Sequence, residues 1–100
     1  MMQYANRKDC FHNRIAAILI QAGWNVIDTS FSRGKLLDMI ACKPRQHIAF
    51  FIEVKTDNAP LTDSEREFIA KHREQCVIIR NIEQAINWVS ENSGCHLKGG

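Results

Sequence analysis

Two acids and a lysine in the middle of the chain are of the types that bind divalent cations and act on phosphate esters. Asp38 lies in one apolar run, while Glu53 and Lys55 lie two residues apart in the next. Carboxylate oxygens suit Mg²⁺ and Mn²⁺, which keep positions open for water and a phosphate oxygen. A nearby lysine can position a water or stabilise a pentavalent phosphate transition state. These residue types therefore indicate metal-dependent phosphate chemistry.

The elements that must position these side chains are two apolar runs, residues 36–43 and 48–55. Residues 44–47 separate them and begin with proline, which favours an antiparallel hairpin. Counting outward from that turn brings Asp38 directly opposite Glu53. Two carboxylates so placed repel and destabilise a sheet by roughly 0.2–1 kcal/mol, or more when shielded from water. We therefore expect a bound cation to offset their charge.

Alternation of side chains divides the hairpin into an apolar face and a mixed face. The apolar face, expected in the core, carries Leu37, Met39, Ala41, Phe50, Ile52 and Val54. The mixed face carries Ile40, Cys42, Ala49 and Phe51 near the turn, and Asp38, Glu53 and Lys55 at the far end. The alternative is that the three charged residues merely face solvent at a strand end, with Glu53 and Lys55 as a weak ion pair. Spacing alone does not decide between the two interpretations.

Three helices are expected around this hairpin. Apolar residues recur at helical spacing over residues 7–22, and Gly23 stands where helices commonly end. Thr62 and Glu65 fit a capping box, which predicts a second helix over residues 63–72. A last apolar stripe, expected to pack on the sheet, consists of Ile82, Ala85, Ile86 and Val89.

Residues 24–29 and 76–79 are rich in β-formers and predict two more strands. The expected order is α-β-β-β-α-β-α, an α/β fold with a mixed four-stranded sheet flanked by helices. Residues 1–92 are expected to form one domain, because a chain of 100 residues falls within the usual range for one. Residues 93–100 are polar and glycine-containing, which predicts a flexible tail.

Composition limits the class of protein. Apolar residues make up 45% of the chain and charged residues 24%, as in ordinary soluble globular proteins. The net charge of +2 does not by itself indicate a nucleic-acid partner. The longest apolar run, residues 15–20, is far below the roughly 18 residues that span a bilayer, so no membrane partner is expected. Four cysteines without a CxxC pair, and no apolar leader over residues 1–10, favour reduced thiols in a cytoplasmic protein.

The pair Leu37-Asp38, the segment Ile52-Glu53-Val54-Lys55 and the pair Leu61-Thr62 at a helix start resemble the PD-(D/E)XK superfamily of nucleases. The nearest likeness is to the small stand-alone VRR-NUC type of phages and bacteria, and it covers residues 9–89. The resemblance implies a restriction-endonuclease-like core.

Site residues follow from the resemblance position by position. Asp38 and Glu53 would bind Mg²⁺ or Mn²⁺, the backbone carbonyl of Val54 would complete the inner shell, and Lys55 would be the catalytic lysine. Relatives supply a glutamate from the first helix, where Asp9 is the acid of this chain.

The chain departs from the family pattern at two further positions. Leu37 stands where a proline usually precedes the aspartate, which changes the backbone but little of the chemistry. Glu65 stands where relatives often present a glutamine or lysine, and the capping box already employs it.

The resemblance implies a metal-dependent endonuclease that hydrolyses DNA phosphodiester bonds. Branched or junction DNA is the substrate of many relatives, including Holliday-junction resolvases, and short relatives commonly act as homodimers. A bacterial or phage-encoded cytoplasmic enzyme is expected. Five basic residues around the hairpin form either a scattered basic surface or, as the site favours, a phosphate track: Arg33, Lys35, Lys43, Arg45 and His47.

The sequence also allows two other functions. The chain can be a catalytically silent DNA-binding module that keeps the fold, or a subunit of a larger restriction or repair complex. The basic side of the first helix, which carries Arg7, Lys8, Asp9, His12, Asn13 and Arg14, is interpreted as a solvated face.

Overall fold

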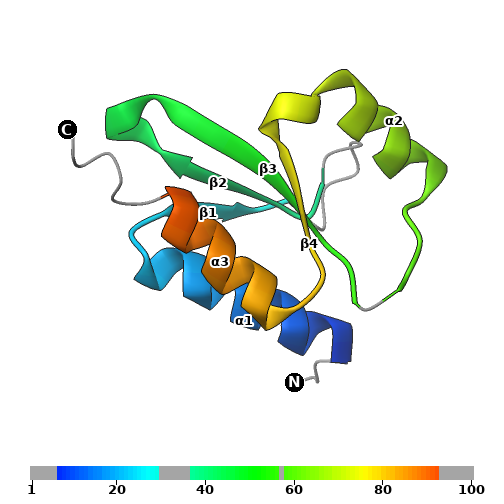
Figure 1. Ribbon diagram of the computed structural model, residues 1–100, viewed down its shortest axis with the longest axis horizontal. Helices are drawn as coiled ribbons and strands as arrows, with labels where there is room; N and C mark the ends of the chain where they lie inside the picture. Colours follow the sequence, from blue (N-terminus) through cyan, green and yellow to red (C-terminus); the bar gives the residue numbers. More distant parts are fainter. Residues whose placement is uncertain (1–6, 30–36, 57, 93–100) are drawn as a thin grey trace.

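In the computed structural model, a mixed four-stranded sheet separates two helices on one face from a single helix on the other (Figure 1). The structure describes residues 7–29, 37–56 and 58–92, and the side chains from residue 10 onward within them. The helices are α1 (Arg7–Gln21), α2 (Asp63–Lys71) and α3 (Ile82–Asn92). The strands are β1 (Asn25–Asp28), β2 (Met39–Lys43), β3 (Ile48–Val54) and β4 (Cys76–Ile79), and short 3-10 helices lie at Pro44–Gln46 and Arg73–Gln75.

The strands lie side by side in the order β1-β2-β3-β4. The pairs β1/β2 and β2/β3 are antiparallel, whereas β3 and β4 are parallel. A parallel pair needs a crossover connection, which α2 and its flanking residues supply. The structure thus has the expected α/β class and mixed sheet, and the carboxyl ends of β3 and β4 meet at one edge.

The predicted hairpin is confirmed. Lys43 pairs with Ile48 next to the turn, and Met39 pairs with Ile52 toward its open end. Between the strands, one 3-10 turn ends at His47, whose φ of 59° is left-handed and whose N–H donates to the Pro44 carbonyl at 3.0 Å. This compact turn fixes the register on which the placement of the acids depends.

Both helix-end signals are also confirmed. Gly23, with φ of +98°, follows α1 and donates its N–H to Ile20 at 3.0 Å, and glycine adopts this left-handed conformation without a Cβ penalty. Thr62 and Glu65 form a complete capping box at the start of α2. The Thr62 hydroxyl accepts from the Glu65 N–H at 3.1 Å, and the Glu65 carboxylate accepts from the Thr62 N–H at 2.8 Å.

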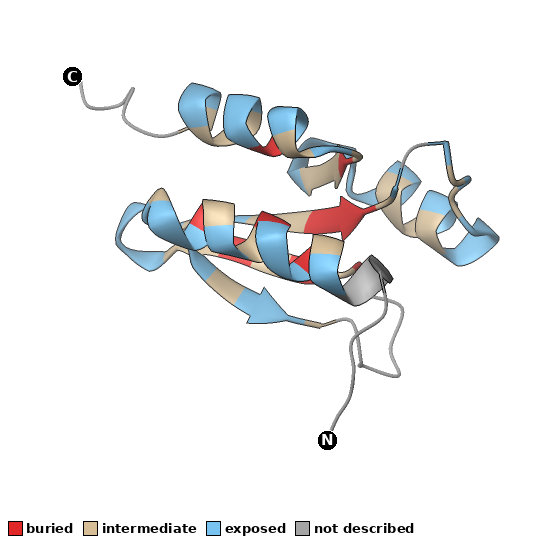
Figure 2. Cartoon of the chain, turned by 90° about the horizontal axis from the view of Figure 1, so that it is seen from below, coloured by how far each residue is buried: buried red, intermediate tan, exposed pale blue. Residues whose placement is uncertain are grey.

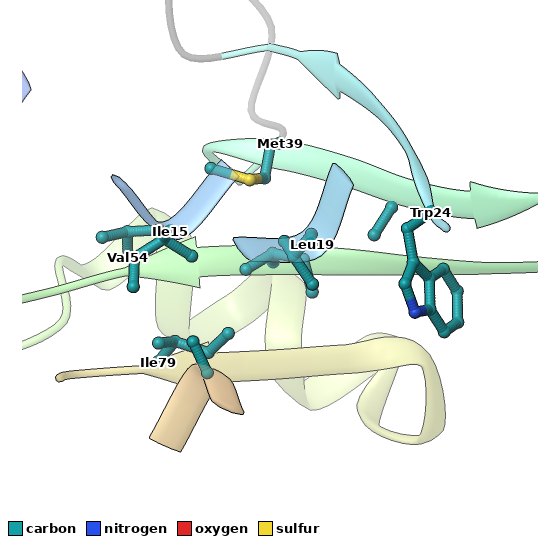
Figure 3. Packing of buried hydrophobic residues seen from close by; sticks show 9 residues of the cluster. Ile15, Leu19, Trp24, Met39, Val54 and Ile79 are labelled. Atoms are coloured by element: carbon teal, nitrogen blue, oxygen red, sulfur yellow. The ribbon is translucent and has the colours of Figure 1, made fainter. Parts of the chain in front are cut away.

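The core lies between the sheet and the helices α1 and α3 (Figure 3). Figure 2 shows buried residues on the helix faces that meet the sheet and exposed ones on the outer faces. On the hairpin, the predicted apolar face is indeed the core face, where Leu37, Met39, Ala41, Ile52 and Val54 are buried. Phe50 is half-buried and packs against this cluster.

The α3 stripe is narrower than expected. Ala85 is fully buried and Ile82 and Val89 pack against the core, but Ile86 is 51% exposed, so its inclusion in the packed stripe was wrong. Part of the space is filled instead by Trp88, whose ring lies 4.8 Å from that of Trp24. The large Trp88 ring covers the sheet from one side of α3, and Ile86 lies on the outer side of the helix.

Three cysteines lie within the described residues, Cys10, Cys42 and Cys76, and all are free thiols, as expected. Burial raises the pKa of the Cys76 thiol above its ordinary value. None of the helices described is both long and apolar enough to cross a bilayer.

Candidate active site

Asp38 precedes Met39 and Glu53 follows Ile52, so both acids lie just beyond Met39–Ile52, the last pair at the open end of the hairpin. The Asp38 backbone carbonyl accepts from Thr29 N–H at 2.9 Å, which extends the β1/β2 pairing past the strand ends. The Asp38 carboxylate accepts from the Val54 N–H at 2.8 Å. Asp38 is thus fixed by its backbone on the β1 side and by its side chain on the β3 side.

Glu53 is buried, with only 2% of its surface exposed. It shares a sheet face with Phe51, whose ring packs on Phe68 of α2 at 5.0 Å, so α2 covers this part of the sheet. The interpretation of Glu53 as a solvent-facing residue is therefore wrong. Burial, the nearby Asp38 charge and a hydrogen bond with Glu65 raise the Glu53 pKa to about 8, against the opposing effect of Lys55.

Lys55 connects the two glutamates. Its Nζ lies 3.0 Å from Glu65 Oε1 and 3.7 Å from Glu53 Oε2, and 13% of its side chain is exposed. The same Glu65 oxygen accepts the Thr62 N–H of the capping box. A local signal for helix initiation therefore also holds the lysine beside the acids.

The two glutamates differ in protonation because their surroundings differ. Burial acts to raise the Glu65 pKa, but hydrogen bonds from the Thr62 N–H, Lys55 and Glu53 outweigh it and leave the Glu65 pKa below 4.5. At neutral pH the two carboxyls therefore share one proton, which Glu53 holds and donates to Glu65. Such separation of neighbouring pKa values is common at functional sites.

The atoms at this end of the hairpin suit a hard divalent cation. Asp38 and Glu53 supply carboxylate oxygens, and their unfavourable charge interaction is of the kind that a cation removes. In an extended strand the N–H and C=O of one residue point to the same side of the strand. The Val54 N–H donates to Asp38, so the Val54 carbonyl points to the Asp38 side as well. No group of three or more His, Cys, Asp or Glu side chains is arranged for a metal among the residues described, so the candidate centre has two acids and a carbonyl.

The first helix brings a different residue to the site than expected. Asp9 lies in the first turn of α1, but its side chain falls outside the part of the structure described. His12, one turn later, is only 8% exposed, so its assignment to a solvated face was wrong. Its Nε2 lies 3.7 Å from Asp28 Oδ1 of β1. Asn13 and Arg14 are exposed, as predicted.

The predicted phosphate track lies mostly elsewhere on the hairpin. Arg33 and Lys35 fall outside the described residues. Lys43, Arg45 and His47 lie at the turn, roughly 17 Å along the strand from the acids. Lys43 is further engaged, because its Nζ lies 4.7 Å from the centre of the Trp24 ring. Phosphate contacts at this end would be remote from the candidate centre.

Two arginines that sequence reasoning did not select lie closer. Arg14 of α1 and Arg80, directly after β4, line a cavity together with Lys55. Val54 pairs with Ile79, and the Lys55 N–H donates to the Ile79 carbonyl at 3.1 Å, so Lys55 and Arg80 leave the sheet at the same edge. The sequence contained this signal, because a strand, a helix and a strand in succession predict a parallel pair whose carboxyl ends coincide.

Comparison of this chain with protein-family models, with curated proteins and with solved structures finds no match.

Proposed function

We propose that this protein is a metal-dependent DNA endonuclease of the PD-(D/E)XK type. The observation that carries the proposal is Glu53, a carboxyl that is 2% exposed, lies beside Asp38 and has a pKa raised to about 8. Burial of an acid next to another acid is costly for the fold, and a bound cation would offset that cost. Lys55, 3.7 Å from Glu53, is the third group that phosphodiester hydrolysis needs.

In this proposal Asp38, Glu53 and the Val54 carbonyl hold Mg²⁺ or Mn²⁺. When bound, the ion supplies a Lewis acid that polarises the phosphate. Asp38 keeps one carboxylate oxygen on the Val54 N–H, and its other oxygen would bind the ion. Glu53 must release its proton to solvent before it can act as a ligand.

Lys55 is assigned the catalytic lysine. Its ammonium group carries three N–H donors, and the contacts with Glu53 and Glu65 leave one to donate to an attacking water or to a phosphate oxygen. Glu65 is a positioning residue, because it acts through Lys55 and is itself held by the capping box.

The finer parts of the proposal come from the resemblance to VRR-NUC-type nucleases. They are a preference for branched or junction DNA, a homodimer that presents two centres to two strands, and a bacterial or phage origin in the cytoplasm. The antiparallel acid-bearing hairpin followed by a helix that begins at Leu61-Thr62 is compatible with that family.

The test is cleavage of labelled linear duplex, single-stranded, flap and four-way-junction DNA with Mg²⁺ or Mn²⁺. The wild-type protein should cut at least one substrate, and Glu53→Gln should not. Glu67→Gln, which removes the same charge from an exposed position of α2, should cut like the wild type. DNA binding that survives chelation without any cleavage would show a silent binding module instead, and cleavage that requires an added protein would show a subunit of a larger complex.

A further inference from the structure

A cavity of about 570 Å³ opens beside the candidate centre, within the range of roughly 300–1,000 Å³ typical of small-molecule sites. It lies where α1, the carboxyl ends of β3 and β4, and the start of α3 meet. Its lining comes from α1, from the end of β3, from the residues that follow β3 and β4, and from Ile82 at the start of α3. Val54 and Lys55 belong to both the cavity lining and the candidate centre, so the cavity adjoins the centre at the carboxyl end of β3.

The charge of this lining favours an anion. Arg14, Lys55 and Arg80 bring cationic side chains, His12 adds an imidazole, and none of the lining residues that the structure describes is an acid. Arg80 is held in place, because its Nη1 donates to the Ala59 carbonyl at 2.8 Å. Guanidinium groups suit phosphate oxygens because they present several N–H donors in a fixed plane.

The remaining lining suits more than a bare phosphate. Phe11, Val54 and Ile82 form an apolar wall. Asn81 accepts the Gln84 N–H on its side-chain oxygen at 2.8 Å, which leaves the amide NH₂ to donate to a ligand. An apolar wall, an amide donor and a group of cations match the base, sugar and phosphate of one nucleotide.

The cavity is concave and the size of a small molecule, whereas a DNA duplex is convex and keeps its bases stacked inside. A nucleotide can therefore enter only if it has left the duplex, which costs a few kcal/mol for a paired base and least for one already unpaired. We propose that this cavity binds one unpaired nucleotide of the substrate strand next to the phosphate that is cut. This inference rests on the proposed function and narrows the substrate to DNA with unpaired nucleotides at the cleavage position.

Binding can be tested without catalysis, on the metal-free protein in EDTA. Thymidine 5′-monophosphate is titrated while amide chemical shifts are recorded, with inorganic phosphate and thymidine as separate probes. The nucleotide should bind more tightly than either probe and shift the amides of Thr56, Asn81 and Ile82. Arg14→Gln should weaken its binding about tenfold, as expected for loss of a hydrogen bond to a charged group. Arg14 is exposed on α1, so this variant should fold.

Arg73→Gln is the matched control. It removes the same charge, but Arg73 precedes β4 and so lies at the other end of that strand from Arg80. Binding should equal that of the wild type. Arg80→Lys is the second variant, which keeps the charge but loses the planar group, and it should also bind more weakly. Equal binding by wild type, Arg14→Gln and Arg80→Lys, or no nucleotide binding at all, would overturn the proposed nucleotide site.

A cleavage assay distinguishes failure of the nucleotide site from failure of the proposed nuclease function. With Mn²⁺, a duplex that carries a single-stranded flap should be cut faster than the fully paired duplex, and Arg14→Gln should reduce that preference. Equal cutting of both substrates by the wild type would refute the nucleotide site but leave the nuclease intact. Nucleotide binding by a protein that cuts nothing would refute the nuclease but leave the site intact.

Discussion

Replacing Glu53 by glutamine should stabilise the metal-free protein at alkaline pH, contrary to the usual effect of a buried substitution. Glutamine is close in shape to the protonated carboxyl, its NH₂ can donate to Glu65 as the Glu53 proton does, and it cannot ionise. The variant should therefore keep the contacts present at neutral pH and lose only the cost of ionisation.

The size of the effect follows from the pKa. The folded protein raises the Glu53 pKa from 4.5 to about 8. Between these values the native state holds a proton that the unfolded state has released, so stability is fully present below pH 4.5 and is lost as pH rises through 8. At 1.36 kcal/mol for each unit of pKa, the loss totals about 5 kcal/mol, of which about 3.5 kcal/mol falls between pH 5 and pH 8.

The measurement is urea unfolding in EDTA at a series of pH values. The free energy of unfolding of the wild type minus that of Glu53→Gln should fall by about 3.5 kcal/mol from pH 5 to pH 8, a large part of the 5–15 kcal/mol typical of a domain. The difference cancels the contributions that the two proteins have in common, and Glu65 is ionised throughout this range. Glu67→Gln is the control. The free energy of unfolding of the wild type minus that of Glu67→Gln should not change with pH. Parallel pH profiles for wild type and Glu53→Gln would refute the reasoning.

Added Mn²⁺ gives the complementary result. An ion that binds only the folded state stabilises it by about 2.7 kcal/mol at one hundred times its dissociation constant. It should restore the stability of the wild type at pH 8 and have little effect on Glu53→Gln, which lacks one of the two charged ligands.

Three other substitutions test the neighbours of Glu53. Asp38→Asn should fold, because an amide oxygen can still accept the Val54 N–H, but it should lose cleavage and show a weaker pH dependence of unfolding, because a charge that raises the Glu53 pKa is gone. Lys55→Ala should abolish cleavage of branched DNA and leave the circular dichroism spectrum unchanged, and a wild-type rate would show the lysine assignment to be wrong. Thr62→Ala should lower the free energy of unfolding by about 1 kcal/mol in urea titrations, because the hydroxyl that accepts the Glu65 N–H is lost. It should keep most of the cleavage, since Glu65 still accepts the Thr62 backbone N–H.

The hairpin could be predicted because its signals are local. Proline at the turn, alternation along both strands and a four-residue connection together define the register that brings Asp38 and Glu53 to the open end of the hairpin, just beyond the pair Met39–Ile52. The capping box at Thr62 was equally legible, because both partners lie within one helical turn.

The burial of the site residues could not be predicted from local sequence signals. Whether Glu53 faces solvent depends on α2, which crosses over the sheet and packs Phe68 on Phe51. His12 is likewise buried by its place beside β1 and the sheet end, although its neighbours in sequence are polar. Such contacts join distant segments, and hydrophobic periodicity of one segment does not contain them.

The parallel β3/β4 pair explains why so many charged groups occur together. A crossover returns the chain in the same direction, so the residues that leave both strands, Lys55 and Arg80, emerge at one edge. The antiparallel β2 begins at that edge and adds Asp38. Asp38 therefore lies on the β2 side of this edge and Arg80 on the β4 side. A phosphodiester strand carries negative charge and would lie over the cations, whereas a divalent cation would lie over the acids. Lys55 links the two groups, because its Nζ lies 3.7 Å from Glu53 Oε2 and 3.0 Å from Glu65 Oε1.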